Sequence, residues 1–311
     1  MRNLMNRFGI VGVLILICIV MACASPVFLS PTNLFNILLQ VSINTIIAVG
    51  MTFVILTAGI DLSVGSVVAL VAVTFGTLLD KGIGFPVSLI GALAVGATGG
   101  FINGLIVAKF RIPAFITTLG MMSMARGAAL IITGGRTIHQ FGPVVRFLGT
   151  GYIGPVPMPA IIAAVVVGCA YYTLSQTRFG RHVYALGGNR EAVRLSGIRV
   201  IRLEIAVYVI GGFTAALGAI VLVGRLNSAQ PIAGYGYELN AIAATIIGGT
   251  SLMGGKGSVI RTLVGALIMG VLQNGLTLLN VSSYVQQVII GGVIILAVLV
   301  DQLRRNMQAF R

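Results

Sequence analysis

The chain has 311 residues, of which 57% are hydrophobic and only 8% are charged. Because a soluble domain carries about 25% charged residues, this composition excludes a soluble globular protein. The formal net charge of +14 would suit a nucleic-acid-binding protein. The basic residues, however, gather in the short polar segments between apolar runs, where they act as orientation signals, so nucleic acid is not an expected partner.

The apolar runs are continuous rather than alternating, which indicates membrane-spanning helices instead of β-barrel strands. The 42 glycines would allow such helices to approach one another closely in lipid. We predict an all-α fold, a polytopic transmembrane helical bundle of about ten spans that forms a single domain over residues 1–311. The expected spans are 9–29, 36–58, 62–79, 85–108, 113–133, 156–174, 203–224, 237–251, 258–279 and 283–300.

The first run follows Arg2 and Arg7 and ends in VMACASP, which is somewhat like a signal-peptide or lipoprotein cleavage site. The run is long enough to cross a bilayer, so we expect an uncleaved first span. With ten spans, about fifteen Lys and Arg fall on one side and about four on the other. The positive-inside rule then predicts cytoplasmic N- and C-termini.

Neutral polar side chains recur within the expected spans. Each could form a hydrogen bond between helices, and together they could line a path for a polar, uncharged solute. Tryptophan is absent and only 7% of residues are aromatic, so such a path would bind a sugar weakly and a separate capture protein would select the solute. The path candidates are Asn44, Thr45, Thr57, Asp61, Asn103, Thr117, Thr118, Gln273 and Asn274.

Three ionisable residues lie within or beside the apolar zone, where an unpaired charge is costly. Asp61 is expected to cap the third span at its N-terminus, a role compatible with a place in the path. Arg126, in the fifth span, should point into the bundle and pair with backbone carbonyls or an acid. Glu238, at the start of the eighth span, should lie near water or a docking partner.

A polar segment at 175–202 contains six arginines and is therefore expected in the cytoplasm. Within it we predict a helix of about two turns, with Asn189 as N-cap, Glu191 in the first turn and Gly197 as a left-handed stop. Ala192, Val193 and Leu195 would give it an apolar contact surface. That surface would meet anionic lipid or a cleft on a soluble partner. The candidate coupling residues are Asn189, Arg190, Glu191, Ala192, Val193, Arg194, Leu195 and Gly197.

No pattern in the chain is typical of an enzyme. The two histidines are expected on opposite sides of the membrane, and no His, Cys, Asp or Glu cluster has metal-ligand spacing, so neither a metal nor a cofactor is predicted. The stretch TSLMGGKGS departs from a phosphate-binding loop at Thr250 and Gly257, which leaves the chain no visible means of using ATP.

Five stretches carry a family resemblance: TNLFNILLQ, AVGMTFVILTAGIDLSVGSVVAL, TRFGRHVYALGGNREAVRLSGI, SAQPIAGYGYELNAIAATIIGGTSLMGGKGS and VSSYVQQVIIGGVIILAVLVD. They are similar to the permease subunits of monosaccharide ABC importers, in particular the ribose type, within the branched-chain amino acid/monosaccharide permease superfamily. The resemblance implies a multi-pass protein of the bacterial inner membrane with a second permease copy, membrane lipid around it, ABC ATPase subunits that use the ATP, and a sugar-binding protein. It also implies that residues 189–197 contain the coupling helix.

Two other functions stay open at this point. A proton-coupled secondary transporter of a small polar solute would use Asp61 or Glu238 as the proton carrier. A membrane enzyme that modifies lipids would need a catalytic constellation, and the sequence contains none.

Overall fold

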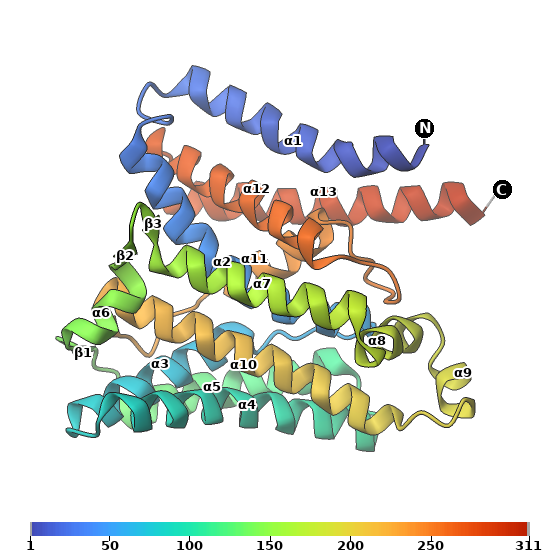
Figure 1. Ribbon diagram of the computed structural model, residues 1–311, viewed down its shortest axis with the longest axis horizontal. Helices are drawn as coiled ribbons and strands as arrows, with labels where there is room; N and C mark the ends of the chain where they lie inside the picture. Colours follow the sequence, from blue (N-terminus) through green and yellow to red (C-terminus); the bar gives the residue numbers. More distant parts are fainter. Residues whose placement is uncertain (1, 310–311) are drawn as a thin grey trace.

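The computed structural model describes the backbone of residues 2–309 and, within them, the side chains of residues 9–299 and 302 (Figure 1). Helices account for most of that range, and the only strands in it are pairs of residues. The elements are α1 (Arg2–Ala24), α2 (Pro31–Leu56), α3 (Val64–Asp80), α4 (Phe85–Phe110), α5 (Ala114–Thr133), β1 (Ile138–His139), α6 (Pro143–Thr150), β2 (Tyr152–Ile153), β3 (Val156–Pro157), α7 (Met158–Gln176), α8 (Arg178–Gly188), α9 (Arg190–Leu195), α10 (Val200–Leu226), β4 (Ser228–Ala229), α11 (Tyr237–Ile247), α12 (Val259–Leu278) and α13 (Ser283–Ala309).

Each of the ten predicted spans overlaps a helix of the structure. Within the described range, six helices are long and apolar enough to cross a membrane: α2, α4, α5, α7, α10 and α12. Shorter apolar helical segments lie at 9–24 in α1, at α3, at α11 and at 283–299 in α13. The protein is therefore an all-α, multi-pass membrane protein.

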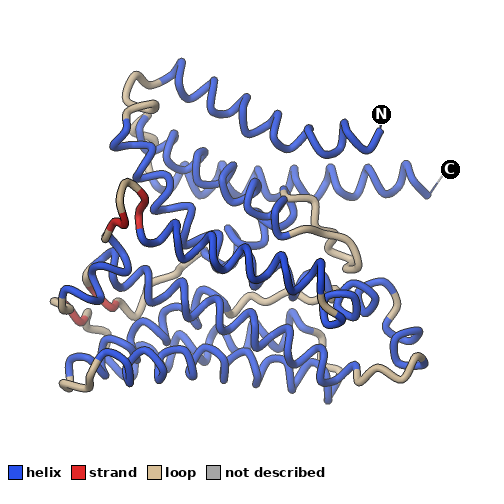
Figure 2. Tube along the Cα trace, in the orientation of Figure 1, coloured by secondary structure: helices blue, strands red, loops and turns tan. Residues whose placement is uncertain are grey.

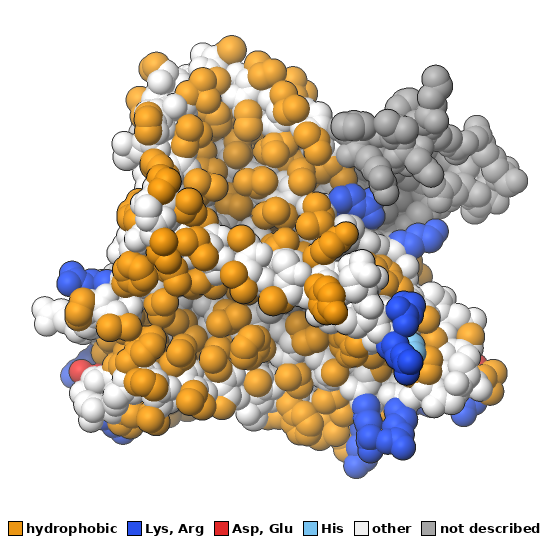
Figure 3. Space-filling view, viewed as in Figure 1, with side chains coloured by type: hydrophobic (Ala, Val, Ile, Leu, Met, Phe, Trp, Pro, Cys, Tyr) orange, Lys and Arg blue, Asp and Glu red, His pale blue; other side chains and the backbone are white. Residues whose placement is uncertain are grey.

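The long helices lie side by side along the long axis of the molecule (Figure 1). The described ends of α1 and α13 lie at the same end of the molecule as α8 and α9, as expected if both termini and the 175–202 segment share one side of the membrane. The short strands and α6 lie at the opposite end. Between the two ends the visible face is largely hydrophobic, and lysine and arginine side chains gather near the ends (Figure 3).

The second half of the bundle repeats the packing of the first half. α10 packs on α4 as α2 packs on α12, and α2 and α10 also pack on each other. α3 contacts α4 and α5, and α11 contacts α12 and α13 in the same order. Since α2 and α10 run in opposite directions in Figure 1, α2–α5 and α10–α13 form an inverted repeat.

Glycine permits a close contact between α4 and α10 within this repeat. Gly96, Gly100 and Gly104 form a stripe along α4 that faces α10. A Cβ at Gly100 would clash with the carbonyl oxygen of Tyr208, and one at Gly212 would clash with that of Gly96. The two backbones therefore touch directly, which replaces the hydrophobic driving force that helices lack in lipid.

The structure corrects the expected eighth span, 237–251. α11 ends at Ile247 and has 11 residues, which at 1.5 Å per residue is roughly 16 Å, about half the hydrocarbon thickness. The loop segments 57–63 and 230–236, which precede α3 and α11, lie within the bundle and extend these two short helices (Figure 2). Such irregular backbone is tolerated at membrane depth only where protein covers it, and Asp61, Pro231 and Gly234 are indeed buried.

Two polar segments between the expected spans contain helices that were not predicted. The polar stretch 134–155 forms α6, and its strand β1 pairs antiparallel with β4, so that Ile138 faces Ala229. The basic segment 175–202 forms α8 as well as the predicted short helix. Glycine and arginine in both stretches obscured helices that tertiary packing stabilises.

Candidate functional site

The predicted short helix is α9, and its ends are made as expected. The side chain of Asn189 accepts a hydrogen bond from the backbone N–H of Ala192 at 2.9 Å, which is N-capping. Glu191 occupies the first turn, and Gly197 has a φ of 79°, the left-handed conformation that ends helices. The helix has six residues, close to two turns.

The expected apolar surface of α9 does not form as one patch. Val193 is only 5% exposed and packs in a cluster with Val183 and Leu186 of α8, whereas Leu195 is 73% exposed. Ala192 and Leu195 are three residues apart and share a face, while Val193 lies about 100° around the helix from Ala192. The outward contact surface is therefore Ala192 and Leu195, and Val193 anchors α9 to its own chain.

Two ion pairs hold α9. Arg190 Nη2 lies 2.8 Å from Glu204 Oε2 in α10. On the solvent side, Arg194 Nε donates to Glu191 Oε2 at 3.0 Å, and this hydrogen bond lowers the pKa of the exposed Glu191 carboxyl. Arg190–Glu204 ties α9 to a long helix, whereas Glu191–Arg194 is internal to α9.

The C-terminal end of α8 packs directly onto two other backbones. A Cβ at Gly187 would clash with the Leu56 carbonyl oxygen at the end of α2 and with the N–H of Gly255. That same Leu56 oxygen accepts a hydrogen bond from Gly255 at 2.9 Å, and Tyr184 donates to the carbonyl of Gly257 at 3.2 Å. We call this contact of α2, α8 and the 248–257 turn the glycine junction, and through it a movement of α8 and α9 would reach the end of α2.

Directly beyond the glycine junction, α2 breaks before α3 begins. Ala58 has a φ of 61°, which stops the helix, and Tyr208 of α10 lies beside Gly59. A cavity of about 370 Å³ lies here, lined in part by Thr57, Gly187, Glu204 and Tyr208. It connects the Arg190–Glu204 pair with the α2–α3 break.

Asp61 lies in that break and is 2% exposed. Its Oδ1 accepts hydrogen bonds from the backbone N–H of Ser63 at 2.8 Å and from the Ser63 hydroxyl at 2.6 Å, and Asn103 donates to that hydroxyl at 2.9 Å. The expectation that Asp61 caps α3 is wrong, since the N-cap is Ser63 and no side chain caps that helix. Asp61 instead closes a turn two residues earlier, because its short carboxylate reaches the N–H at i+2.

The side chain of Arg126 points into the bundle, as predicted. Its Nη1 donates to the carbonyl oxygens of Pro231 at 2.9 Å and Ala233 at 2.8 Å, which holds the loop before α11. Glu238 is half-buried, and a Cβ at Gly65 in the first turn of α3 would clash with its Oε2. Glu238 therefore lies between the starts of α3 and α11, and the expectation that it lies near water or a docking partner stays a prediction. The short helices α3 and α11 thus begin next to each other, where Gly65 meets Glu238.

Four of the path candidates do not lie at the α2–α3 break. Asn274 donates to Asn33 at 2.8 Å, and Gln273 donates to Asn240 at 3.2 Å, both as contacts between helices. Asn44 and Thr45 are buried within α2. The structure thus brings Thr57, Asp61 and Asn103 near one break, with Thr118, next to Thr117, donating to the carbonyl of Ile60 at 3.2 Å.

Several buried polar atoms have no hydrogen-bond partner within the described part of the chain. They include the hydroxyls of Thr45, Thr117 and Tyr208 and the Oδ1 of Asn103. Sequence reasoning missed Tyr208, although a tyrosine within the apolar run 203–224 is a signal that could have found it. Over the residues that the structure describes, no group of three or more His, Cys, Asp or Glu could hold a metal ion.

Comparison with known proteins gives consistent matches. A family model described as "Branched-chain amino acid transport system / permease component" matches residues 33–298. The ribose import permease protein RbsC of Escherichia coli (strain K12) is 49% identical over 302 residues, which cover 96% of this chain and 94% of that protein. RbsC of Bacillus subtilis (strain 168) is 44% identical over 302 residues, with the same two shares, 96% and 94%. The L-arabinose ABC transporter permease protein AraH of Azospirillum brasilense is 38% identical over 307 residues, 98% of this chain and 90% of that protein. No solved structure matches the chain.

Proposed function

The chain belongs to the family of branched-chain amino acid transport system permease components, and on that premise we propose that it is the membrane-spanning permease of an ABC importer for ribose. The observation that carries this proposal is the nearly complete alignment with ribose import permeases at 44% to 49% identity. An L-arabinose permease at 38% identity supports the wider class of monosaccharide.

Residues 1–311 act as one permease domain in the bacterial inner membrane, with ten crossings and both termini in the cytoplasm. The clustering of the described chain ends with α8 and α9 supports this topology (Figure 1). The repeat supports it as well, since α3 and α11 would each cross the membrane together with the partly buried loop that precedes it. Met1, Phe310 and Arg311, which the domain includes, lie outside the described residues.

The complex contains a second permease copy, ABC ATPase subunits and a sugar-binding protein, with lipid around the bundle and no nucleic acid. This chain holds no cofactor, because the partner ATPase uses the ATP. The exposed face of α9, with Ala192, Arg194 and Leu195, binds a cleft of the ATPase. The sugar-binding protein docks at the other end, near 134–155 and the start of 225–240, where β1 and β4 hold the two segments together.

Movement of α9 reaches the solute path through two contacts. The Arg190–Glu204 pair transmits the movement of α9 to α10, and the glycine junction transmits the movement of α8 to the end of α2. Because α2 and α10 are the paired helices of the inverted repeat, both halves receive the movement. The bundle then switches between two discrete packings as the segments around Asp61 and Arg126 rearrange.

A sugar passing this region loses hydrogen bonds to water, and hydroxyl and amide groups can replace them. The partnerless Oδ1 of Asn103 and hydroxyl of Thr117 support a role near the α2–α3 break, where they would gain partners in the other packing. Asp61 belongs to the framework of that break, since both of its hydrogen bonds shape the turn.

The comparisons do not favour the alternative of a proton-coupled transporter, because the relatives carry the names of import permeases and of an ABC transporter permease. Reconstitution tests the proposal directly. The chain is placed in vesicles with its ATPase and with candidate binding proteins, each loaded with one labelled pentose or hexose. ATP-dependent uptake should be highest for ribose. Uptake that needs a proton gradient instead of ATP would contradict the proposal.

A further inference from the structure

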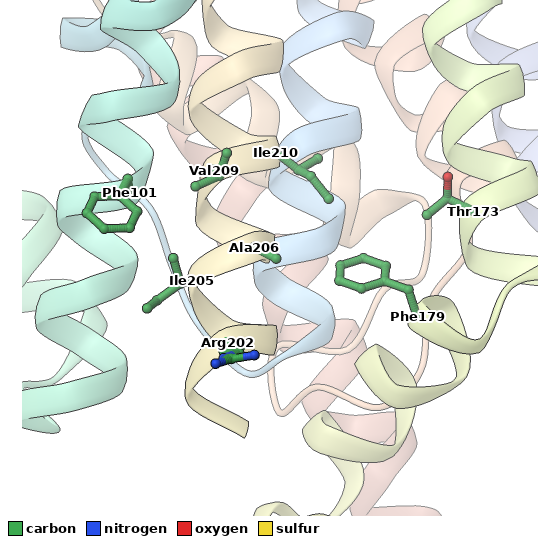
Figure 4. A pocket seen from close by; sticks show the side chains of 8 residues that line it. All are labelled: Phe101, Thr173, Phe179, Arg202, Ile205, Ala206, Val209 and Ile210. Atoms are coloured by element: carbon green, nitrogen blue, oxygen red, sulfur yellow. The ribbon is translucent and has the colours of Figure 1, made fainter. Parts of the chain in front are cut away.

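An apolar groove opens on the outer surface of the bundle where α4, α7, α8 and α10 meet (Figure 4). Its volume is about 600 Å³, and Phe101 of α4 and Phe179 of α8 form opposite walls. The floor is the outward face of α10, with Ile205, Ala206 and Val209. Among the described residues that line it, Arg202 alone is charged.

A second cavity, of about 660 Å³, lies between the end of α4, helix α9 and the start of α10. One acid and six basic residues line it; the acid is Glu191 and the basic residues are Lys109, Arg111, Arg190, Arg194, Arg199 and Arg202. Of these basic residues, Arg190 forms an ion pair with Glu204 and Arg194 forms one with Glu191. The other four basic residues form no salt bridge within the described part of the chain, so this basic cleft holds a large uncompensated positive charge.

Arg202 lines both cavities, so the apolar groove and the basic cleft meet at its side chain. In Figure 4 it lies at the end of the row that Ile205, Ala206 and Val209 form along α10. Phe110 beside the cleft is 62% exposed, and Lys109 Nζ lies 5.8 Å from the centroid of its ring. Lysine and arginine side chains gathered at the end of an apolar helix are typical of the boundary between the hydrocarbon core and the headgroups.

We propose that this pair of cavities binds one anionic phospholipid, with its phosphate at Arg202 and the basic cleft and one acyl chain in the groove. The charge of the cleft complements a phosphate diester, and the groove continues from it with the apolar lining that an acyl chain requires. A solute on its way through the bundle would not fill the groove, because the groove opens outward and shares no lining residue with the cavity at the α2–α3 break. A free anion would fill the cleft alone and leave the groove without a ligand.

The bound lipid would contact α4, α8 and α10 beside α9. It would therefore stabilise the packing of α8 and α10, the helices that α9 contacts. The proposal depends only on insertion in a membrane and is independent of the solute. Its test measures lipid retention without ATPase or sugar, so its failure would leave the transport proposal untouched.

The test is native mass spectrometry of the purified full chain in detergent, titrated with phosphatidylglycerol and, separately, with phosphatidylcholine. The wild-type chain should retain one phosphatidylglycerol in preference to phosphatidylcholine. Arg202→Gln should weaken that binding about fivefold, which corresponds to ~1 kcal/mol for one basic side chain at an anionic headgroup. Ala206→Trp should reduce it as well, although it changes no charge, because the indole fills the groove.

Two control variants make the same kinds of substitution outside the two cavities. Lys256→Gln removes an exposed charge at the same end of the molecule, and Ala94→Trp adds an indole on an exposed face of α4; neither residue lines the cavities. Both should bind lipid as the wild type does, and all four variants should elute as folded protein in gel filtration.

Equal losses in Lys256→Gln and Arg202→Gln would overturn the proposal, because general attraction would then explain the binding. Displacement of the lipid by glycerol phosphate at equal concentration would overturn it too, since the acyl chain would contribute nothing. A third contrary result is an Arg202→Gln chain that keeps its lipid but no longer binds the ATPase, which would assign the cleft to an acidic protein surface.

Discussion

Arg190 on the short helix α9 and Glu204 on the long helix α10 form an ion pair with an N–O distance of 2.8 Å. The Glu204 side chain is 10% exposed and the Arg190 side chain 42% exposed, so the carboxylate is the buried partner. This pair is the direct charged link between the proposed ATPase-binding surface and the helix that packs on both α2 and α4.

Loss of either partner should uncouple ATP hydrolysis from uptake. Arg190→Ala leaves a buried carboxylate without its cation, so it should be more harmful than Glu204→Gln. A double-mutant cycle on ATPase stimulation should give a coupling energy on the order of 1 kcal/mol between the two positions. Additive effects of the two changes would contradict a direct link.

The glycine junction provides a second test. Gly187→Ala should destabilise the purified chain by about 1–3 kcal/mol, because the added Cβ overlaps the Leu56 carbonyl. Thermal unfolding in detergent measures this. The matched control is Gly188→Ala, where a Cβ would meet nothing within 4 Å, and its unfolding should be unchanged.

The cap of α9 can be tested with one conservative variant. Asn189→Ala removes the hydrogen bond to Ala192 and should cost about 1 kcal/mol of helix stability. Stimulation of the ATPase by the permease should fall accordingly. Asn189→Asp retains a side-chain acceptor and should behave as the wild type does; if it fails equally, the capping role is wrong.

Arg126 should control access to the loop before α11. Arg126→Gln loses the two charged hydrogen bonds to Pro231 and Ala233, each worth about 1.5–3 kcal/mol. In a chain whose native cysteines are replaced by serine, alkylation of Ala233→Cys should then become faster. Ser123→Ala on the same helix, whose hydroxyl reaches only Leu119, should leave the rate unchanged.

A substitution of Asp61 distinguishes an ABC importer from a proton-coupled transporter. Asp61→Asn keeps an oxygen that can accept from Ser63, so the turn should persist and ATP-driven uptake should stay within a few-fold of the wild type. Uptake measured across a pH gradient without ATP should be absent in both proteins. Gradient-driven uptake that disappears only in the variant would identify Asp61 as a proton carrier.

Local sequence signals predicted α9 well and its packing poorly. Asn189 and Gly197 act on their own backbone or on that of near neighbours, so the cap and the left-handed stop could be read from spacing alone. Whether Val193 faces a partner or its own chain depends on α8, and α8 was not expected. Arg126 is an intermediate case, because a buried arginine requires acceptors, but only the fold identifies Pro231 and Ala233.

The sequence by itself determined the ten apolar segments, the membrane location and the short capped helix, since hydropathy and capping depend on residues close together in the chain. Only the tertiary structure decided that α3 and α11 begin together inside the bundle, that α2 ends against Gly187 and Gly255, and that Arg202 joins a groove to a basic cleft. These relationships join residues far apart in the sequence, and in a chain this rich in glycine and apolar residues many helix pairings satisfy the same local pattern. Close backbone packing selects one of them.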